Sequence, residues 1–332
     1  MNFVWRDAGR VVVFRDSGIA DAPRLLAEHG MDSFDLLSTE RHLAAAPGLA
    51  HAALAVHDVA AGGVPEAAAA LLDSARAPNL VALGGGRTID VAKAVAAVTG
   101  ARVAAIPTTM AGAEMTGIHR LPAGAEGRVR SLVRPALVIA EPEAMTSAPE
   151  PELRASSMNA LAHGADSLYT PFANPVSAMT ALRGAELIAR SLDEGPVERD
   201  RAALALGSLL CGYAIDSGGF ALHHVVCQTL VRVCGSPHAG TNAAVLPRAM
   251  SFMTPRAPEQ LTALASAIDT SPDNLESRLL HLGGNSPGLG AIGADRSKLP
   301  QALDEMLSRP ELAFTPEPPN RSELERLIEA AW

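Results

Sequence analysis

Short apolar runs alternate with amphipathic segments along the first part of the chain. The runs have the length and composition of buried parallel strands and fall at residues 11–14, 34–37, 80–83, 103–106 and 136–139. The segments with apolar residues at helical spacing are 18–29, 64–77 and 89–98. Strands and helices in alternation predict an α/β domain over residues 1–150, with a Rossmann-like parallel sheet covered by helices on both faces.

The pattern changes near Pro149-Glu150-Pro151, after which β-branched runs become rare and helical spacing dominates. The expected helices are 151–168, 175–192, 199–215, 218–234, 257–267, 297–308 and 321–331. Residues 268–297 contain several Gly, Pro, Ser and Asn residues and are expected to be irregular. We therefore predict an all-helical C-terminal domain over residues 151–332.

Composition and charge exclude several classes of protein. The chain has 332 residues and a net charge of −9, without the basic blocks that bind nucleic acid. No apolar run reaches the length of a membrane span, and Met1–Asp7 lacks the pattern of a signal peptide. Three cysteines are too few for a disulfide framework. We expect a soluble cytoplasmic protein that binds neither nucleic acid nor membrane.

A glycine turn is the strongest chemical signal in the first domain. Gly84, Gly85 and Gly86 follow the strand 80–83 and precede a helix. Glycines let the backbone pass close to a ligand, and the first turn of the helix offers unpaired N–H groups to an anion. This context predicts a site for the diphosphate of a dinucleotide.

Histidines form a second constellation, in the helical domain. Asn159 and His163 are four residues apart and share one face of a predicted helix. His223, His224 and His238 follow further along the chain, so a metal site would require separate segments to converge. Three neutral imidazoles at one point would suit a catalytic divalent metal. The remaining histidines considered are expected to be ordinary core or surface residues: His29, His42, His51, His57 and His281.

The chain resembles the iron-containing alcohol dehydrogenase superfamily, and within it the maleylacetate reductase branch. Four blocks carry the resemblance: GGGRTIDVAKA at 84–94, IPTTMAGAEMT at 106–116, MNALAHGADSLY at 158–169, and LHHVVCQTLVRVCGSPHAGTNAAVLP at 222–247. The family fold is a dinucleotide-binding α/β domain followed by a helical domain, which agrees with the predicted division. The resemblance also implies a homodimer.

The resemblance implies hydride transfer from NADH or NADPH to a small substrate, which in the maleylacetate branch contains a carbon–carbon double bond conjugated to a keto acid. The implied cofactor residues are Gly84, Gly85, Gly86, Arg87, Asp90, Thr108, Thr109, Ser38 and Thr39. Lys93 is expected to extend along the surface. Because Glu40 and Arg41 have opposite charges beside Thr39, either cofactor is expected to bind.

Metal use is left open by the same resemblance. His163, His224 and His238 match ligand positions for Fe or Zn, but Asn159 stands where metal-using relatives carry an aspartate. An amide lacks the charge that favours a divalent ion. Without a metal, these histidines are expected to polarise a substrate carbonyl or to donate a proton.

Several positions depart from the family pattern. Gln228 replaces a histidine that relatives carry one helical turn after His224, so His223 becomes an alternative proton donor. Arg87 either pairs with a cofactor phosphate or faces solvent, and Arg248 either meets a carboxylate or faces solvent. Arginines in the short segment 117–135 suit an acidic substrate, namely Arg120, Arg128 and Arg130.

Two alternatives remain beside the reductase. Loss of groups that support hydride chemistry, at Asn159 and Gln228, suits a family member recruited to a non-redox lyase or cyclase step. The other alternative is a metal-dependent alcohol dehydrogenase.

Overall fold

The computed structural model describes residues 10–128 and 131–332, so Arg130 and the first nine residues lie outside the described part. The chain divides into two compact units between Ser147 and Ala148, close to the predicted boundary at 150. We call residues 10–147 the N-terminal unit and residues 148–332 the C-terminal unit.

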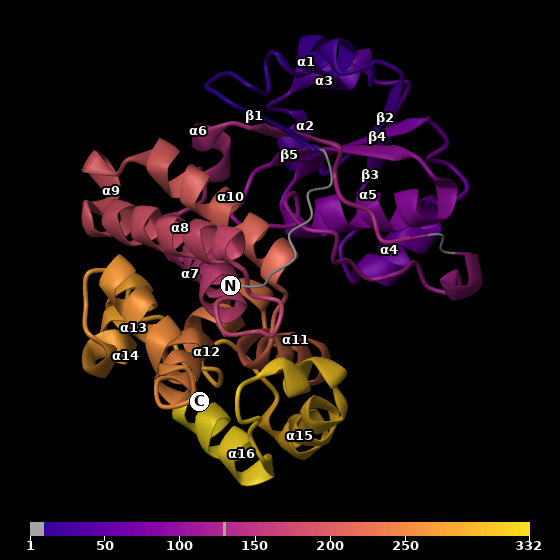
Figure 1. The fold of residues 1–332 in the computed structure, drawn as a ribbon. Coiled ribbons are helices and arrows are strands. Elements are labelled where there is room, and N and C mark those ends of the chain that lie inside the picture. Colours follow the sequence, from indigo (N-terminus) through magenta and orange to yellow (C-terminus); the bar gives the residue numbers. More distant parts are fainter. Residues whose placement is uncertain (1–9, 129–130) are drawn as a thin grey trace. The chain divides into compact units, whose positions relative to one another are not determined.

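The N-terminal unit is built on one parallel sheet of six strands in the order β1-β6-β5-β4-β2-β3 (Figure 1). The strands are β1 (Val11–Phe14), β2 (Phe34–Ser38), β3 (Ala55–Asp58), β4 (Asn79–Gly84), β5 (Arg102–Pro107) and β6 (Leu137–Ala140). The helices are α1 (Ala22–Glu28), α2 (Glu40–Leu43), α3 (Pro47–Ala52), α4 (Val64–Leu71), α5 (Gly86–Thr99) and α6 (Pro142–Met145). The expected α/β fold is confirmed.

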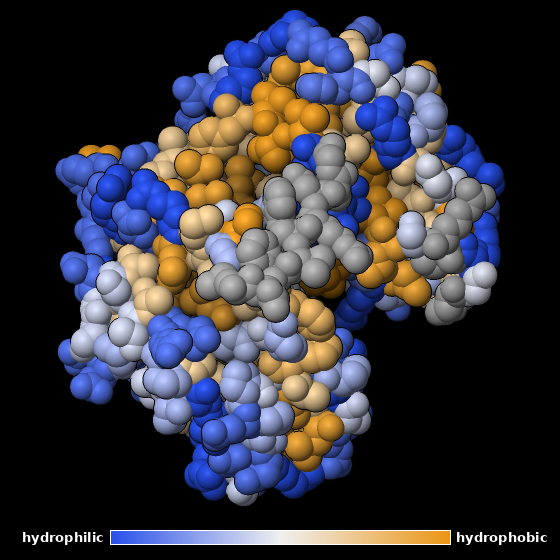
Figure 2. Space-filling model, in the orientation of Figure 1, coloured by the Kyte–Doolittle hydropathy of each residue, from blue (hydrophilic) through white to orange (hydrophobic). Residues whose placement is uncertain are grey.

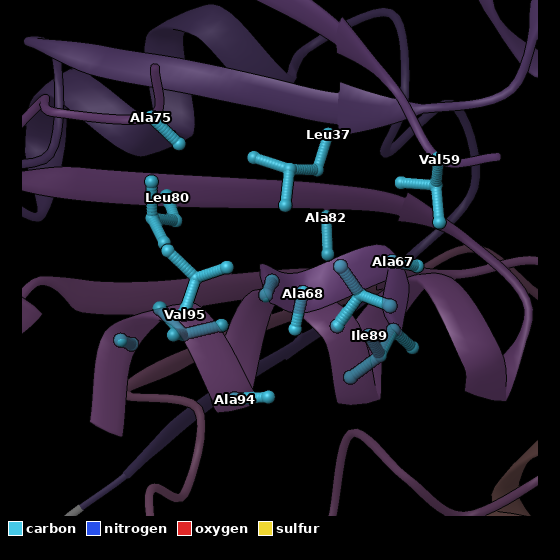
Figure 3. Close-up of a cluster of buried hydrophobic side chains, with 14 of the residues drawn as sticks. Leu37, Val59, Ala67, Ala68, Ala75, Leu80, Ala82, Ile89, Ala94 and Val95 are labelled. Atoms are coloured by element: carbon cyan, nitrogen blue, oxygen red, sulfur yellow. The ribbon is translucent and has the colours of Figure 1, made fainter. Parts of the chain in front are cut away.

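Helices pack on both faces of this sheet because its strands are apolar on both sides. Leu80 and Ala82 of β4 face α4 and α5, where Val95 belongs to the same buried cluster (Figure 3). Val81 and Leu83 lie in the opposite cluster with residues of α1 and α3. The near-continuous apolar runs in the sequence reflect this two-sided burial.

The C-terminal unit is helical in its described residues. Its helices are α7 (Glu150–Ser167), α8 (Pro175–Asp193), α9 (Gly195–Glu198), α10 (Arg201–Gly218), α11 (Leu222–Cys234), α12 (His238–Met253), α13 (Pro258–Ala267), α14 (Leu275–Leu282), α15 (Leu299–Ser308) and α16 (Arg321–Ala330). Hydrophilic residues cover much of the visible outer surface of this unit, with small apolar patches between them (Figure 2).

Several predicted elements are wrong in detail. Residues 268–297 are not irregular throughout, because they contain α14. The helix expected at 218–234 begins only at Leu222, since Gly219 adopts a positive φ of 71° and ends α10. Strand β3 was missed because its residues are only half-buried or exposed.

No single helix in the described part of the chain is long and apolar enough to cross a membrane. One bent pair, α10 with α11, passes a combined test of length and composition.

Candidate functional site

The carboxyl edge of the sheet gathers most of the predicted cofactor residues. The connections that follow β2 and β4 run toward opposite edges of the sheet, and ligands of open parallel sheets bind at such a reversal. Gly84 pairs with Pro107 in the strand register, and the amide of Thr108 donates to the carbonyl of Gly84 at 3.0 Å. The glycine turn and Thr108 therefore lie side by side at this edge.

The glycine turn combines close backbone approach with an open helix start. Gly85 is the N-cap of α5 and supplies no side-chain cap, so the first N–H groups of the helix are left for a ligand. A Cβ at Gly86 would lie 2.7 Å from the Cβ of Ala111, and one at Gly85 would lie 3.2 Å from Cγ2 of Thr109. The turn therefore requires glycine at Gly86 and presents α5 to an anion such as a diphosphate.

Two predicted cofactor residues are engaged within the protein. Ser38 is fully buried, and its hydroxyl donates to the carbonyl of Leu83 at 2.8 Å. The guanidinium of Arg87 donates to the carbonyls of Val59 and Ala60 in the loop after β3. The Arg87 side chain therefore connects α5 to a neighbouring loop. This differs from both expected roles, which were pairing with a cofactor phosphate and facing solvent.

The expected surface position of Lys93 is wrong. Its side chain is completely buried, and Nζ donates to Asp90 Oδ1 at 2.9 Å, Ala113 O at 3.0 Å and Ile118 O at 2.8 Å, with Thr116 Oγ1 at 3.4 Å. The buried ammonium thereby holds the loop after β5 against α5. Asp90 forms an ion pair with Lys93, and we keep its role at the cofactor as a prediction.

A cleft of about 660 Å³ opens at the same edge of the sheet. It is lined by Ser17, Ile19, Ala20, Arg41, His42, Ala45, Ala46, Pro47, Gly48, Leu49, Leu83, Thr108, Glu141, Glu143, Ala144 and Ser147. His42 approaches Thr39 Oγ1 through Nδ1 at 2.9 Å and Thr108 Oγ1 through Nε2 at 3.2 Å. Sequence reasoning treated His42 as an ordinary residue, and its position just after a strand end was the only signal available.

In the C-terminal unit, one face of α7 carries the second group of polar residues. Asn159, His163 and Asp166 are spaced by four and three residues, which places them on a common helix face. All three are buried. Asp166 was not among the predicted site residues, although its spacing from His163 was visible in the sequence.

Asp166 organises the start of α11. Its carboxylate accepts the amides of Ala221 at 2.9 Å and of His223 and His224 at 3.2 Å, together with Nδ1 of His224 at 2.9 Å and the hydroxyl of Tyr169. Burial opposes the charge, but the hydrogen bond from His224 and the other donors hold the pKa of Asp166 below its usual range. The residue is an anionic cap that fixes the orientation of the His224 ring.

His224 and His163 form a stacked imidazole pair. Their ring centroids are 5.0 Å apart with an interplanar angle of 21°. Nε2 of His224 and Nδ1 of His163 are buried and have no hydrogen-bond partner among the described residues. Burial, and then the neighbouring histidines, lower the pKa of His163, so this ring is neutral. The pair can therefore offer one polar nitrogen from each ring to a bound molecule.

The ring of His223 is engaged within the protein, which argues against a role as proton donor. Nε2 of His223 lies 2.9 Å from Oδ1 of Asn242, and Cys227 Sγ lies 3.5 Å from the same nitrogen. Burial lowers the pKa of His223 to about 3, with a further contribution from His224. The ring is thus neutral and engaged with α12.

The donor set lacks the negative charge that favours a divalent metal ion. Among the described residues, no group of three or more His, Cys, Asp or Glu side chains could hold one. His163 and His224 stack, while His238 is exposed at the start of α12. Asn159 adds no negative charge. We therefore assign no catalytic step to a metal.

The other positions that depart from the family pattern differ from one another in burial and contacts. Gln228 is half-buried on α11, one turn after His224. Arg248 meets a carboxylate, one of the two expected alternatives, because it forms an ion pair with Glu276 within the protein. It also donates to the carbonyl of Ala330 at 3.0 Å. Arg120 and Arg128 are exposed.

The sheet carries a glycine turn at its reversal point, and the helical unit carries buried imidazoles. This combination is typical of dinucleotide-dependent enzymes. The family model for iron-containing alcohol dehydrogenase matches residues 12–142, and the model for the C-terminal part of the Fe-containing alcohol dehydrogenase family matches residues 154–332. The chain belongs to the iron-containing alcohol dehydrogenase family and is an oxidoreductase.

Within this family the chain is similar to maleylacetate reductases. It is 38% identical to maleylacetate reductase 1 of Rhodococcus opacus over 81% of this chain and 77% of that protein. It is 32% identical to the Pseudomonas aeruginosa maleylacetate reductase over 81% of this chain and 80% of that protein. The crystal structure of the Agrobacterium tumefaciens maleylacetate reductase superposes with a TM-score of 0.88 at 28% identity, covering 100% of this chain and 98% of that one.

Proposed function

We propose that this protein is an NAD(P)H-dependent reductase that transfers hydride to the carbon–carbon double bond of a small unsaturated keto acid. The similarity to maleylacetate reductases supports this reaction. A reduced nicotinamide cofactor, with its diphosphate held at the glycine turn, would supply the hydride for one alkene carbon, and the electron pair of the double bond would move to the keto oxygen. A proton then adds to the other alkene carbon, giving the saturated keto acid and NAD(P)⁺.

The observation that carries the proposal in the structure is the orientation of His224. Asp166 holds its Nδ1, which leaves the buried Nε2 for a substrate oxygen or a transferred proton. We assign to His224 the donation of a proton from Nε2–H to the keto oxygen as negative charge develops there, which gives the enol and requires Nε2 to carry a proton. When the enol returns to the ketone, a proton from solvent adds to the other alkene carbon and the enol proton returns to Nε2 of His224. His163, stacked on the same ring, supplies a second polar nitrogen.

The test replaces His224 with alanine. We expect turnover of maleylacetate to fall by about 10² or more, as for loss of an acid–base group, while NADPH affinity stays within a few-fold. His281→Ala, at an exposed histidine on α14, is the matched control and should leave both values unchanged. Joint loss of cofactor binding and turnover in His224→Ala would instead indicate a structural histidine.

A non-redox role is the second candidate, and Gln228 favours it. Glutamine cannot relay a proton at neutral pH, so α11 lacks the histidine that relatives carry at this position and that supports hydride chemistry. Failure of folded protein to bind either NADH or NADPH, followed by nicotinamide fluorescence, would support this candidate. Binding of either cofactor supports the reductase.

The dehydrogenase alternative, the substrate charge and the assembly remain predictions with direct tests. Metal analysis of protein purified without chelators addresses a metal-dependent alcohol dehydrogenase. The acidic substrate is expected from the arginines of segment 117–135, the cytoplasmic location from the composition of the sequence, and the homodimer from the resemblance to the family. Light scattering of the purified protein tests the dimer.

A further inference from the structure

We propose that this enzyme prefers NADPH to NADH, and that Arg41 is the residue that recognises the 2′-phosphate of NADPH. The inference rests on the proposed function and adds the cofactor specificity that the sequence left open. It is carried by the position of Arg41 in the cleft at the carboxyl edge of the sheet.

The geometry of the sheet assigns this end of the cleft to the adenosine ribose. The diphosphate belongs to the glycine turn after β4, and β2 lies directly beside β4. In dinucleotide-binding sheets, the residues after the strand next to the phosphate strand contact the ribose hydroxyls, where an acidic side chain selects NADH and an arginine accepts the 2′-phosphate. In this chain, those residues are Thr39, Glu40, Arg41 and His42.

The structure separates the two opposite charges in this segment. Arg41 and His42 line the cleft, whereas Glu40 is exposed and does not line it. Thr39 holds the position after the strand end, and its neutral hydroxyl is engaged with His42. No carboxylate from this segment is therefore placed to receive the ribose hydroxyls or to repel a phosphate.

The Arg41 side chain is available for a ligand. Its guanidinium has no ion pair or hydrogen bond among the residues that the structure describes, in contrast to Arg87 near the glycine turn. His42 beside it is held between two threonines, and burial together with the charge of Arg41 lowers the pKa of His42. A neutral His42 adds a hydrogen-bonding group next to the arginine without a competing charge.

Two other carboxylates line the cleft, but they follow a different strand. Glu141 and Glu143 come after β6, which β5 and β4 separate from β2 in the strand order. Glu141 already accepts the amide of Ile19 at 2.8 Å. These residues therefore belong to the far end of the cleft, away from the position assigned to the 2′-phosphate.

The experiment measures dissociation constants for NADPH and NADH by nicotinamide fluorescence at low ionic strength. We expect the wild-type protein to bind NADPH about tenfold or more tightly than NADH, the ratio that one strong phosphate contact supports. Arg41→Ala should remove most of this ratio by weakening NADPH while NADH stays within about twofold, and Arg41→Glu should reverse it. Adenosine 2′,5′-bisphosphate should compete with bound cofactor better than 5′-ADP only when Arg41 is present.

Arg190→Ala, at an exposed arginine on α8, is the control variant and should leave the ratio unchanged. Equal or tighter binding of NADH by the wild-type protein, or an unchanged ratio in Arg41→Ala, would overturn the inference and leave the reductase standing. Absence of binding for both cofactors in folded protein would overturn the proposed function as well.

Discussion

At the scale of single residues, burial decides the chemistry of charged groups more than their sequence neighbours do. Glu114 is fully buried, and neither carboxylate oxygen has a hydrogen-bond partner among the described residues. Burial raises the pKa of Glu114 from 4.5 to about 7, and the charge of Asp90 adds to this, while Lys93 and Arg10 oppose it. The folded state therefore favours the protonated acid.

Stability should consequently fall as pH rises through this range. Because the pKa is higher in the folded state than in the unfolded state, the contribution of Glu114 to stability is fully present below the unfolded value of 4.5 and is lost as the pH rises to about 7. At about 1.4 kcal/mol per pKa unit, this shift corresponds to a loss of about 3.5 kcal/mol. Glu114→Gln, which cannot titrate, should lose this component, and melting curves of both proteins from pH 5 to 8 would show it. Parallel curves across that range would contradict the argument.

Residue chemistry also shows what the sequence could and could not predict. The glycine turn was recognisable because its strand and helix are adjacent in the chain. The burial of Lys93 was not, because its carbonyl acceptors, Ala113 and Ile118, come from a loop twenty or more residues away. The bridge from His42 to Thr108 likewise spans 66 positions and depends on strand order.

At the scale of elements, the close packing of α8 and α10 depends on small residues. A Cβ at Gly184 would lie 2.6 Å from Cys211 Sγ and 2.8 Å from the carbonyl oxygen of Gly207. The two helices thus approach with backbone nearly in contact. Hydrophobic periodicity predicted the helices in this region, but it carries no information about which glycines sit at a crossing.

Substituting alanine at this crossing should destabilise the protein. We expect Gly184→Ala to lower the free energy of unfolding by about 2 kcal/mol, because either the helices separate or Cys211 leaves its rotamer. Urea denaturation monitored by circular dichroism measures the change. Gly48→Ala is the control, since a Cβ there meets nothing within 4 Å. A neutral Gly184→Ala would show that the helices separate without cost.

At the scale of the whole molecule, the two units divide the chemistry between them. The glycine turn and the cleft belong to the N-terminal unit, while the imidazoles and all three cysteines belong to the C-terminal unit. In the sequence, the expectation of two domains rests on strand-like runs that stop before the long helices begin. It could not reveal that His163 and His224 stack, since that contact depends on how α7 and α11 cross.

The cysteines offer a selective measure of opening in the C-terminal unit. Cys211, Cys227 and Cys234 are buried, and burial raises the pKa of Cys211 to about 12 and raises those of the other two thiols. A thiol reacts as its thiolate and only when reagent can reach it. The native protein should therefore show no rapid reaction with Ellman's reagent at pH 8, whereas all three thiols should react in denaturant. Gly184→Ala should speed the slow native reaction, because Cys211 lies at the strained crossing; a rapidly reacting thiol in the wild-type protein would contradict this closed arrangement.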